Sequence, residues 1–417
     1  MFVLHSHTFL LGYLSSTLWQ TPRMRNVLTI NAGSSSIRFA IYDAGGRRKV
    51  LAGKMERIGL SGTTLTVEEP GRGAASPKHI EVDGSAVVHL MTWLASHASF
   101  ATVGAVGHRV VHGMQHSDPQ RVTPELLAEL RRMTPYDPEH LPREIELIEH
   151  IRRAHPGLPQ VACFDTAFHR SMPRVATLLS VPRRYQAQGV QRYGFHGLSY
   201  AYLMAELARA GDRAATRGRV ILAHLGNGAS LAAVLDGKSI DTSMGFTPAA
   251  GVVMSTRSGD LDPGVISFLA ATESMDIAAY QKMVTEESGL LGVSETSSDA
   301  RDLLAREAGD VRAAEALALF CYQIKKWIGA FAAALGGLDT LVFAGGIGEN
   351  AAILRRRMCE GLEFLGIELS EARNARNAPL VSADSGSVAV RVIRTDEESV
   401  IVSSTLRVLG WETTNEA

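Results

Sequence analysis

The sequence predicts an α/β protein built from two related domains, and three observations support this fold class. The chain has 417 residues, 46% of them hydrophobic, which is too long for one ordinary core. Apolar, strand-like runs alternate with segments of helical period along most of its length. Residues 26–46 and 219–243 also share one pattern: an apolar strand, a turn rich in Gly, Asn and Ser, and a second strand. We interpret this shared pattern as an internal duplication.

Composition and charge exclude several classes of partner. The net charge is -1, from 42 basic and 43 acidic residues, so nothing indicates nucleic acid or an anionic membrane as the main partner. No segment is apolar for long enough to cross a membrane. The three cysteines, Cys163, Cys321 and Cys359, lie far apart in apolar contexts, which favours inert buried thiols over a disulfide framework. We therefore expect a cytoplasmic protein.

The first 23 residues do not follow the pattern of the rest. Their apolar part is broken by histidines and serines and lacks a basic start, whereas a clean strand pattern opens after Met24. A weak signal peptide is one interpretation of this segment. We favour an extension, 1–23, that is disordered or loosely docked and is not part of the fold. A protein that starts at Met24 should then match the full chain in melting temperature and activity.

The remaining chain has strand, turn and helix signals in a regular order. Periodicity predicts strands in 27–33, 36–43, 103–113 and 160–169, and helices in 84–98, 123–133 and 142–157. The helix at 123–133 begins with a Thr cap and a Pro at its first helical position. In the second half, 219–243 repeats the strand–turn–strand opening, 313–337 is a long buried helix, and 338–358 is typical of a strand, a glycine turn and a helix.

Three glycine-rich turns indicate where a phosphate chain could bind. Glycine permits close backbone approach, and Ser or Asn adds short donors. The turns are Asn31–Ser36, Gly226–Gly228 and Gly345–Gly348. One such turn alone is more often a plain hairpin, but two matched turns and a third between a strand and a helix favour nucleotide binding. Arginines, histidines and carboxylates also gather where apolar runs end, which suits charge stabilisation on phosphate together with a magnesium ion.

The motifs, in their order, resemble the acetate kinase family, of the superfamily that also holds sugar kinases, actin and the large heat-shock ATPases. They are INAGSSS, GHRVVHG, FDTAFH, RYGFHG, HLGNG, MGFTP, TRSGDLDPG, GGIGEN and TDEE, and the match runs from about Met24 to Ser403. The resemblance implies two duplicated actin-like, ribonuclease H-like ATPase domains with a nucleotide cleft between them. It places the N-terminal domain at 24–167, joined by the C-terminal segment 397–417, and the nucleotide-binding domain at 168–396.

The resemblance also implies an activity, a reversible reaction of ATP and acetate that gives ADP and acetyl phosphate. ATP is then a substrate, Mg²⁺ is the expected cofactor with Mn²⁺ as a substitute, and a homodimer is the expected assembly. A carboxylate is already ionised at pH 7, so this chemistry needs no general base. Two alternatives stay open: a kinase that prefers propionate or another short-chain carboxylate, and a non-catalytic ATP-binding switch of the actin type.

Roles for individual residues follow from the same resemblance. The implied catalytic residues are Asp165, His196, Arg257 and Arg109. Arg109 would clamp the substrate carboxylate, Arg257 the transferring phosphoryl group, and Asp165 would position substrate or magnesium water. The implied substrate-binding residues are Arg109, Val111, Tyr136, Phe195 and Pro248. The implied ATP-binding residues are Ser34, Ser36, Arg38, His224, Leu225, Gly226, Asn227, Gly228, Asp299, Ala300, Arg301, Gly346, Ile347, Gly348, Glu349 and Asn350. The implied metal-linked residues are Asn31 and Glu397.

Several residues depart from the family pattern, mostly near the carboxylate pocket. Arg38 stands where the family usually has Lys, and Tyr200 where it has His after FHG. Met114 and Ser255 each replace a glycine. In TPYDPEHLP, Tyr136 and Asp137 take the places of a Leu and a His. We expect the Tyr136 ring to pack against the acyl group and the Asp137 carboxylate to turn away from the substrate.

Overall fold

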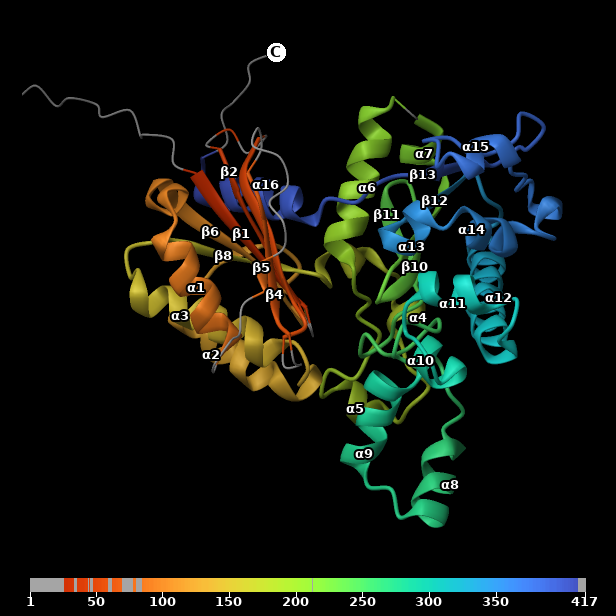
Figure 1. Ribbon diagram of the computed structural model, residues 1–417, viewed down its shortest axis with the longest axis horizontal. Helices are drawn as coiled ribbons and strands as arrows, with labels where there is room; N and C mark the ends of the chain where they lie inside the picture. The colour runs from red at the N-terminus through yellow and green to blue at the C-terminus, as the bar shows by residue number, and fades with distance from the viewer. Residues whose placement is uncertain are drawn as a thin grey trace, which may run out of the picture.

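The described part of the chain forms two α/β domains, which lie side by side in Figure 1. A computed structural model describes residues 26–411, apart from residues 34–35, 44, 46–47, 59–61, 70–77, 80–84 and 212. The predicted extension 1–23 and the predicted ATP ligand Ser34 therefore lie outside the described residues. Within the described part, no helix is both long enough and apolar enough to span a membrane.

The N-terminal domain is built on a mixed sheet. Its strands are β1 (Asn26–Ala32), β2 (Ser36–Tyr42), β3 (Lys49–Glu56), β4 (Thr64–Glu68), β5 (Lys78–His79), β6 (Val103–Val110), β7 (Gln120–Arg121) and β8 (Gln160–Phe164). Their order in the sheet is β5-β4-β3-β2-β1-β6-β8-β7. Strands β1 to β4 are joined antiparallel, whereas β1, β6 and β8 run parallel. The polar residues that follow these three parallel strands therefore share one edge of the sheet.

Helices cover both faces of this sheet, which explains why its central strands are apolar on both sides. On one face, Leu28 of β1 packs in a cluster with Leu90 of α1 (Ala86–Ser96) and Leu147 of α3 (Leu141–Ala154). On the other face, Val27 packs with Val402 of α16 (Glu397–Leu409). The predicted helix at 123–133 is α2 (Pro124–Met133), and its Thr123 hydroxyl accepts a hydrogen bond from the Leu126 amide as an N-cap.

The C-terminal domain repeats the same strand order. Its strands are β9 (Arg219–Leu225), β10 (Ala229–Leu235), β11 (Lys238–Thr242), β12 (Thr340–Ala344) and β13 (Ala389–Val392), in the order β11-β10-β9-β12-β13. The first three are antiparallel, and β9, β12 and β13 are parallel. This arrangement matches β3-β2-β1-β6-β8 strand for strand. The internal duplication predicted from the two glycine turns is thereby confirmed.

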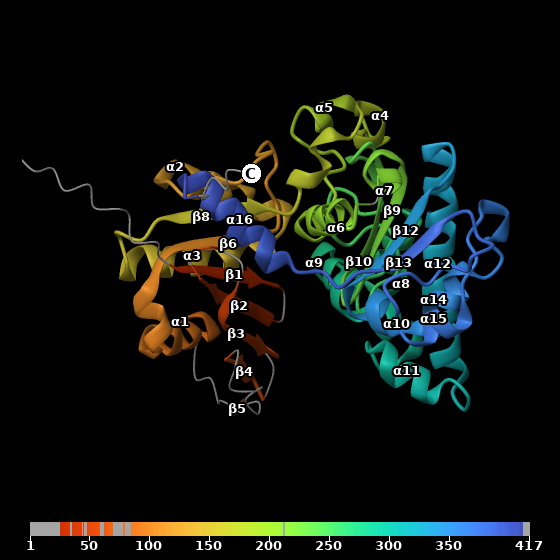
Figure 2. The ribbon, with the colours of Figure 1, turned by 90° about the horizontal axis from the view of Figure 1, so that it is seen from above.

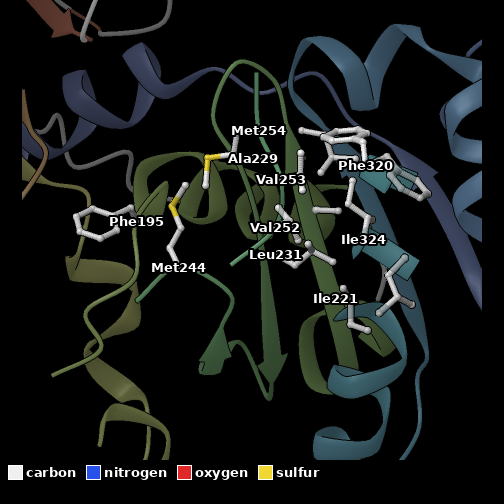
Figure 3. Packing of buried hydrophobic residues seen from close by; sticks show 14 of the residues in the cluster. Phe195, Ile221, Ala229, Leu231, Met244, Val252, Val253, Met254, Phe320 and Ile324 are labelled. Carbon is white, nitrogen blue, oxygen red and sulfur yellow. The ribbon is translucent and has the colours of Figure 1, made fainter. Parts of the chain in front are cut away.

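The long helix predicted at 313–337 is α12 (Val311–Leu335), and it covers the C-terminal sheet. It begins at Asp310, whose carboxylate accepts from two backbone amides, and ends at Gly336 in the left-handed conformation. Figure 3 shows Phe320 and Ile324 of this helix facing the sheet. The prediction that the helix is buried holds for one face only, because Tyr322 on the opposite face is 59% exposed.

The other helices of the described chain are shorter and join the strands. They are α4 (Arg174–Thr177), α5 (Arg183–Gln186), α6 (Gly197–Arg209), α7 (Arg213–Arg217), α8 (Gly264–Glu273), α9 (Ile277–Lys282), α10 (Gly289–Ser294), α11 (Ala300–Arg306), α13 (Gly345–Asn350), α14 (Ala352–Cys359) and α15 (Glu371–Ala375). The three cysteines are free and buried, as the sequence predicts.

The two domains exchange their last helices. Helix α6 follows β8 of the N-terminal sheet, but its Leu203 packs with Val220 and Val342 of the C-terminal sheet. Helix α16 follows β13 of the C-terminal sheet, but it packs on β1, β6 and β8 (Figure 2). The two helices contact each other where the chain crosses between the domains. Polar residues at the start of each helix are thus held at the junction of the two sheets.

Candidate active site

Arg109 and Asp165 meet at the edge of the N-terminal sheet where β6 and β8 end. The Arg109 guanidinium donates to Asp165 Oδ2 through Nε at 3.0 Å and Nη2 at 2.6 Å, and through Nη1 to the carbonyl of Ala32 at 2.9 Å. Asp165 is fully buried, and its second oxygen, Oδ1, has no hydrogen-bond partner among the described residues. The guanidinium is therefore fixed in place by its neighbours, while one oxygen of a buried carboxylate is left for a ligand.

A second buried carboxylate, that of Glu144, lies next to Arg109. Its Oε2 accepts from the backbone amide of Val111 at 3.0 Å, and its Oε1 lies 4.0 Å from Arg109 Nη1. Burial raises the pKa of Glu144 to about 8, against the opposing effects of Arg109 and the Val111 amide. This residue was not among the predicted site residues. A signal was present, because Glu144 is on the same helical stripe as the buried Leu141 and Ile148.

Asn31 and Glu397, the predicted metal-linked residues, are in contact with each other. Asn31 Nδ2 donates to Glu397 Oε2 at 2.7 Å, which joins the end of β1 to the start of α16. Burial raises the pKa of the Glu397 carboxyl, and the nearby charge of Asp165 raises it further. Arg38, placed opposite Asn31 in the β1–β2 ladder, acts in the opposite direction. The carboxylates of Asp165 and Glu397 thus lie close enough to repel each other at this edge of the sheet.

Two histidines face each other on the C-terminal side. The rings of His196 and His224 are 4.3 Å apart between centroids. His196 is held at φ 59° just before α6, and its Nδ1 lies 2.8 Å from the Ser230 hydroxyl. His224 Nδ1 lies 2.8 Å from the Ser199 hydroxyl. Burial lowers the pKa of His196 well below its usual range and that of His224 to about 4, so both rings are neutral at pH 7.

Arg257 reaches the same place from the C-terminal domain. Its Nη1 donates to the carbonyl of Pro248 at 3.3 Å, and its Nη2 donates to His140 Nε2 at 3.3 Å. A methyl group added at Gly228 would lie 3.1 Å from His196 Nε2 and 3.6 Å from Arg257 Nη1. The structure therefore brings the predicted residues His196, Arg257 and Gly228 together against one glycine turn.

The second and third glycine turns lie side by side because β9 and β12 are parallel neighbours. Ala344 is in register with His224, and a methyl group added at Gly226 would be 3.8 Å from the Gly346 amide nitrogen. At Gly346, no atom of the described part of the chain lies within 4 Å of the place where a side chain would be. The predicted loop at 345–348 is the first turn of α13 instead, because Gly345 adopts φ 76° and the chain then coils at once.

Three further predicted ATP ligands, Glu349, Asp299 and Arg301, have hydrogen bonds in the structure. Glu349 Oε1 accepts from the amides of Gly345 at 3.0 Å and Thr395 at 3.2 Å, so its carboxylate holds the turn together. The described hydrogen bonds of Asp299 join it to Ser297, Arg301 and Leu303, at the start of α11. The start of α11 is thus in the same domain as the glycine turns. No hydrogen bond among the described residues connects the two.

The predicted acyl pocket contains the segment that departs most from the family pattern. Val111 and Phe195 are buried, and the Tyr136 hydroxyl donates to the Gln188 carbonyl at 2.8 Å. A small cavity between the domains is lined by residues from both, including Tyr136, Pro248 and Arg257.

The expected position of Asp137 differs from the one observed. Asp137 is 3% exposed and lines this cavity, instead of turning away from it. Its Oδ1 accepts from His140 twice, from the backbone amide at 3.1 Å and from Nδ1 at 2.8 Å. Burial alone would raise the pKa of Asp137, but the bonds from His140 and the charge of Arg257 lower it. The two hydrogen bonds from His140 and the nearby charge of Arg257 therefore stabilise the buried carboxylate.

Comparison with known proteins decides the family. The model of the acetokinase family matches residues 26–403, nearly all of the described chain. The chain belongs to the acetokinase family. It is therefore a phosphotransferase with the actin-like fold predicted from its motifs.

Relatives of this acetokinase carry two different names. A propionate kinase from Citrobacter rodentium is 42% identical over 93% of this chain and 98% of its own length. An acetate kinase from Rhodopseudomonas palustris is 44% identical over 90% of this chain and 96% of its own. Among solved structures, the acetate kinase from Porphyromonas gingivalis has a TM-score of 0.82 at 36% identity, and the propionate kinase from Francisella tularensis a TM-score of 0.86 at 33% identity. Each covers 92% of this chain, which in turn spans 100% of each.

The other departures of this acetokinase have structural consequences. The buried Tyr200 hydroxyl is hydrogen-bonded to the Ser230 hydroxyl, and Ser230 is hydrogen-bonded to Nδ1 of His196. Tyr200 therefore helps to fix the His196 ring through Ser230. Met114, one of the two positions where the resemblance predicts a glycine, adopts φ 44°, a conformation that favours glycine. Ser255, the other, donates its amide to the Asn227 carbonyl at 3.2 Å. Ser230 and His140 were not predicted as site residues. Ser230 is a single polar residue at the start of an apolar run, whereas His140 stands in the polar segment TPYDPEHLP and had no such signal.

Proposed function

We propose that this acetokinase transfers the terminal phosphoryl group of ATP to acetate, with propionate as the second candidate substrate. The observation that carries the proposal is the convergence of Arg109, Arg257 and neutral His196 from two domains. A carboxylate and a phosphate chain repel each other, and such a group of donors reduces that repulsion. Propionate is kept as a candidate because close relatives are named for each of the two acids.

In the proposed mechanism, positioning and charge stabilisation do the catalytic work. Acetate needs no base, because it is ionised at pH 7. Arg109, fixed by Asp165, binds the carboxylate, and the buried side chains of Val111 and Phe195 contact its methyl group. Arg257 and His196 donate hydrogen bonds to the phosphoryl oxygens as charge spreads over them in the transition state. Because His196 is neutral, it acts as a hydrogen-bond donor and adds no cation.

The residues at the edge of the N-terminal sheet fit a divalent cation such as Mg²⁺ or Mn²⁺. Asp165 offers an unpartnered buried oxygen, and the neighbouring Glu397 carboxylate is destabilised by it. A cation between these groups would remove that repulsion and, in the reaction, would neutralise phosphate charge. Among the described residues, no group of three or more His, Cys, Asp or Glu side chains could enclose a metal. Phosphate and water would complete the shell, as is usual for Mg²⁺.

The domain limits that we propose follow the exchanged helices. We assign 24–167 with 397–417 to the N-terminal domain and 168–396 to the nucleotide-binding domain, which is supported by the packing of α16 on β1, β6 and β8. Expressed alone, residues 168–396 should then unfold cooperatively. Residues 24–167 should do so only when 397–417 is supplied, and a stable 24–167 fragment would contradict these limits.

A homodimer is the assembly that we propose, with α8 and α9 in the interface. Helix α8 has an apolar sequence but no buried residue, and Phe268 is 64% and Ile277 of α9 72% exposed. Exposed apolar patches of this kind mark association surfaces. Light scattering should give a dimer for the wild type and a monomer for Phe268→Asp. Phe364→Asp, at a single exposed Phe elsewhere, is the control that should stay dimeric. We also infer a cytoplasmic location from the three free cysteines.

The proposed reaction is tested by measuring ADP formation with Mg²⁺ and formate, acetate, propionate or butyrate. The acyl phosphate is trapped with hydroxylamine as a second readout. We expect turnover with acetate, weaker or comparable turnover with propionate, and little with butyrate. Absence of turnover on all four acids would overturn the proposal in favour of a non-catalytic ATP-binding protein.

A further inference from the structure

His140 occupies an unusual position between a carboxylate and the guanidinium of Arg257. It is 5% exposed, its Nδ1 lies 2.8 Å from Asp137 Oδ1, and its Nε2 lies 3.3 Å from Arg257 Nη2. Arginine can only donate, so Nε2 must accept and carries no proton. The single ring proton is then on Nδ1, directed at the Asp137 carboxylate. Both neighbours therefore require the same neutral tautomer.

The Asp137 carboxylate is well placed to hold this tautomer. Its Oδ1 accepts from both the backbone amide and the ring of His140, so one oxygen fixes the residue's position and ring orientation. Asp137 ends a short 3₁₀ turn, Thr134–Tyr136, and His140 directly precedes α3. The pair is thus part of the turn itself, three residues apart, and comes from the domain opposite to Arg257.

The Arg257 side chain has few other constraints. Its remaining hydrogen bond among the described residues goes to the Pro248 carbonyl at 3.3 Å, and the Met254 sulfur lies 3.9 Å from Nη1. Long side chains with free rotamers lose entropy when they are immobilised at the moment of reaction. A fixed acceptor across the domain junction removes part of that loss before substrate arrives.

We propose that His140 is a positioning residue for the reaction, which orients the Arg257 guanidinium toward the phosphoryl group and is itself oriented by Asp137. This inference rests on the function proposed above. It also gives the sequence PYDPEH a role: Asp137, His140 and Arg257 form a chain of hydrogen bonds, called the relay below, in which no proton is transferred. Contact between His140 and Arg257 spans the two domains, so the guanidinium is aligned only while the domains are together.

Two substitutions at position 140 test the Nε2 acceptor and the Nδ1 donor of His140 separately. In His140→Gln, the amide oxygen can take the place of Nε2 and accept from Arg257. In His140→Asn, the amide can still donate to Asp137, but it is too short to reach Arg257. The matched control is His150→Asn, the same change ten residues along, about 15 Å away on α3. Asp137→Asn is an independent arm, because an amide no longer enforces a proton on Nδ1.

We expect kcat to fall roughly tenfold to a hundredfold in His140→Asn and Asp137→Asn, as for a misplaced catalytic group. His140→Gln should stay within about threefold of the wild type, with a difference smaller than 1 kcal/mol in barrier. KM for ATP and the melting temperature should change little in the His140→Asn, Asp137→Asn and His140→Gln variants. Arg257 is only partly buried, so water can bind the N–H group that loses its partner. His150→Asn should behave as the wild type.

The results distinguish failure of the proposed function from failure of the inference about His140. If the wild type has no turnover with any of the acids, the proposed function is wrong. If the wild type turns over and His140→Asn keeps its kcat, the relay is refuted. Equal loss in His140→Asn and His140→Gln at unchanged melting temperature would also refute it, because the acceptor would not matter. Should His140→Asn fail to fold, His140→Leu replaces it, and equal kcat for Leu and Gln would refute the relay.

Discussion

The strand ends of the two domains differ in chemistry, although the strands have the same order. At the edge of the N-terminal sheet the side chains are charged: Arg109, Asp165 and, from α16, Glu397. At the edge of the C-terminal sheet the backbone is exposed by Gly226 and Gly346, and the neighbouring His224 is neutral. One duplicated framework thus carries two chemically different strand edges.

This difference shows what a duplicated fold fixes and what it leaves free. The strand order fixes where chain ends meet, but each copy can place either charges or bare amides there. Charges suit a small carboxylate and a cation, and amides suit a long phosphate chain that must approach the backbone closely. We therefore expect substitutions in the N-terminal set to alter chemistry or acyl preference, and substitutions in the glycine turns to alter nucleotide binding.

Arg257 is the strongest test of this comparison, because it is a charged residue supplied by the glycine-rich domain. Arg257→Ala should lower kcat at least about a hundredfold, since a donor to transition-state charge is lost. KM for ATP should change little. Steady-state kinetics with Arg184→Ala, an exposed arginine on α5, gives the control. A change confined to KM for ATP would make Arg257 part of the nucleotide surface.

Two glycines divide the glycine turns between nucleotide binding and chemistry. In Gly346→Ala the new methyl group meets no atom of the described residues, so the melting temperature should hold or rise while KM for ATP increases about tenfold, or 1.4 kcal/mol. In Gly228→Ala the methyl group presses on His196 at 3.1 Å, so kcat should fall more than ATP affinity. Calorimetric ATP binding and kcat on both variants measure this split. The division is wrong if the two variants behave alike.

Tyr136 tests whether the N-terminal side sets acyl preference. Tyr136→Leu removes a ring that packs near His112 and Phe246 and a hydroxyl that binds the Gln188 carbonyl, which widens the cavity. The propionate-to-acetate ratio of kcat/KM should rise by about tenfold, within the 1–3 kcal/mol that one methylene contributes. KM for ATP should stay constant. Tyr185→Leu, on an exposed tyrosine, is the control, and an unchanged ratio would remove Tyr136 from the pocket.

Glu144 gives the smallest expected effect, a change in how stability depends on pH. Its pKa is 4.5 in the unfolded chain and about 8 in the folded protein. Between these values the folded state binds a proton that the unfolded state releases, so this group makes the free energy of unfolding fall as pH rises from 4.5 to 8. Glu144→Gln removes that contribution.

Melting temperatures at pH 5 to 9 measure this effect. As the pH rises from 5 to 8, the melting temperature of the wild type should fall relative to that of Glu144→Gln, and the gap between the two curves should stay constant above pH 8. Glu146→Gln, on the exposed face of the same helix, should follow the wild type. Parallel curves for Glu144→Gln and wild type would mean that Glu144 is ionised when folded.

Much of the fold could be predicted from sequence, because its signals are local. The apolar strands, the Thr123 cap and the glycine turns each specify a short segment, and the repeat of 26–46 in 219–243 links the two sheets. The motif residues Arg109, Asp165, His196 and Arg257 were predicted as site residues in the same way. Their partners were not, since Ser230, Glu144 and His140 meet the motifs only after the chain has folded. Asp137 and His140 are three residues apart, but their contact with Arg257 joins residues more than a hundred positions apart, and no local pattern contains that information.

The exchange of α6 and α16 has a consequence for how the protein is made. The N-terminal strands leave the ribosome early, but Tyr42 finds its partner Asp396 only 354 residues later. At about 5–20 residues per second, the face of β1 and β2 that α16 covers waits roughly 20 to 70 seconds for its helix. During synthesis this apolar face is therefore open to chaperones, and the first domain to be translated is the last to be completed.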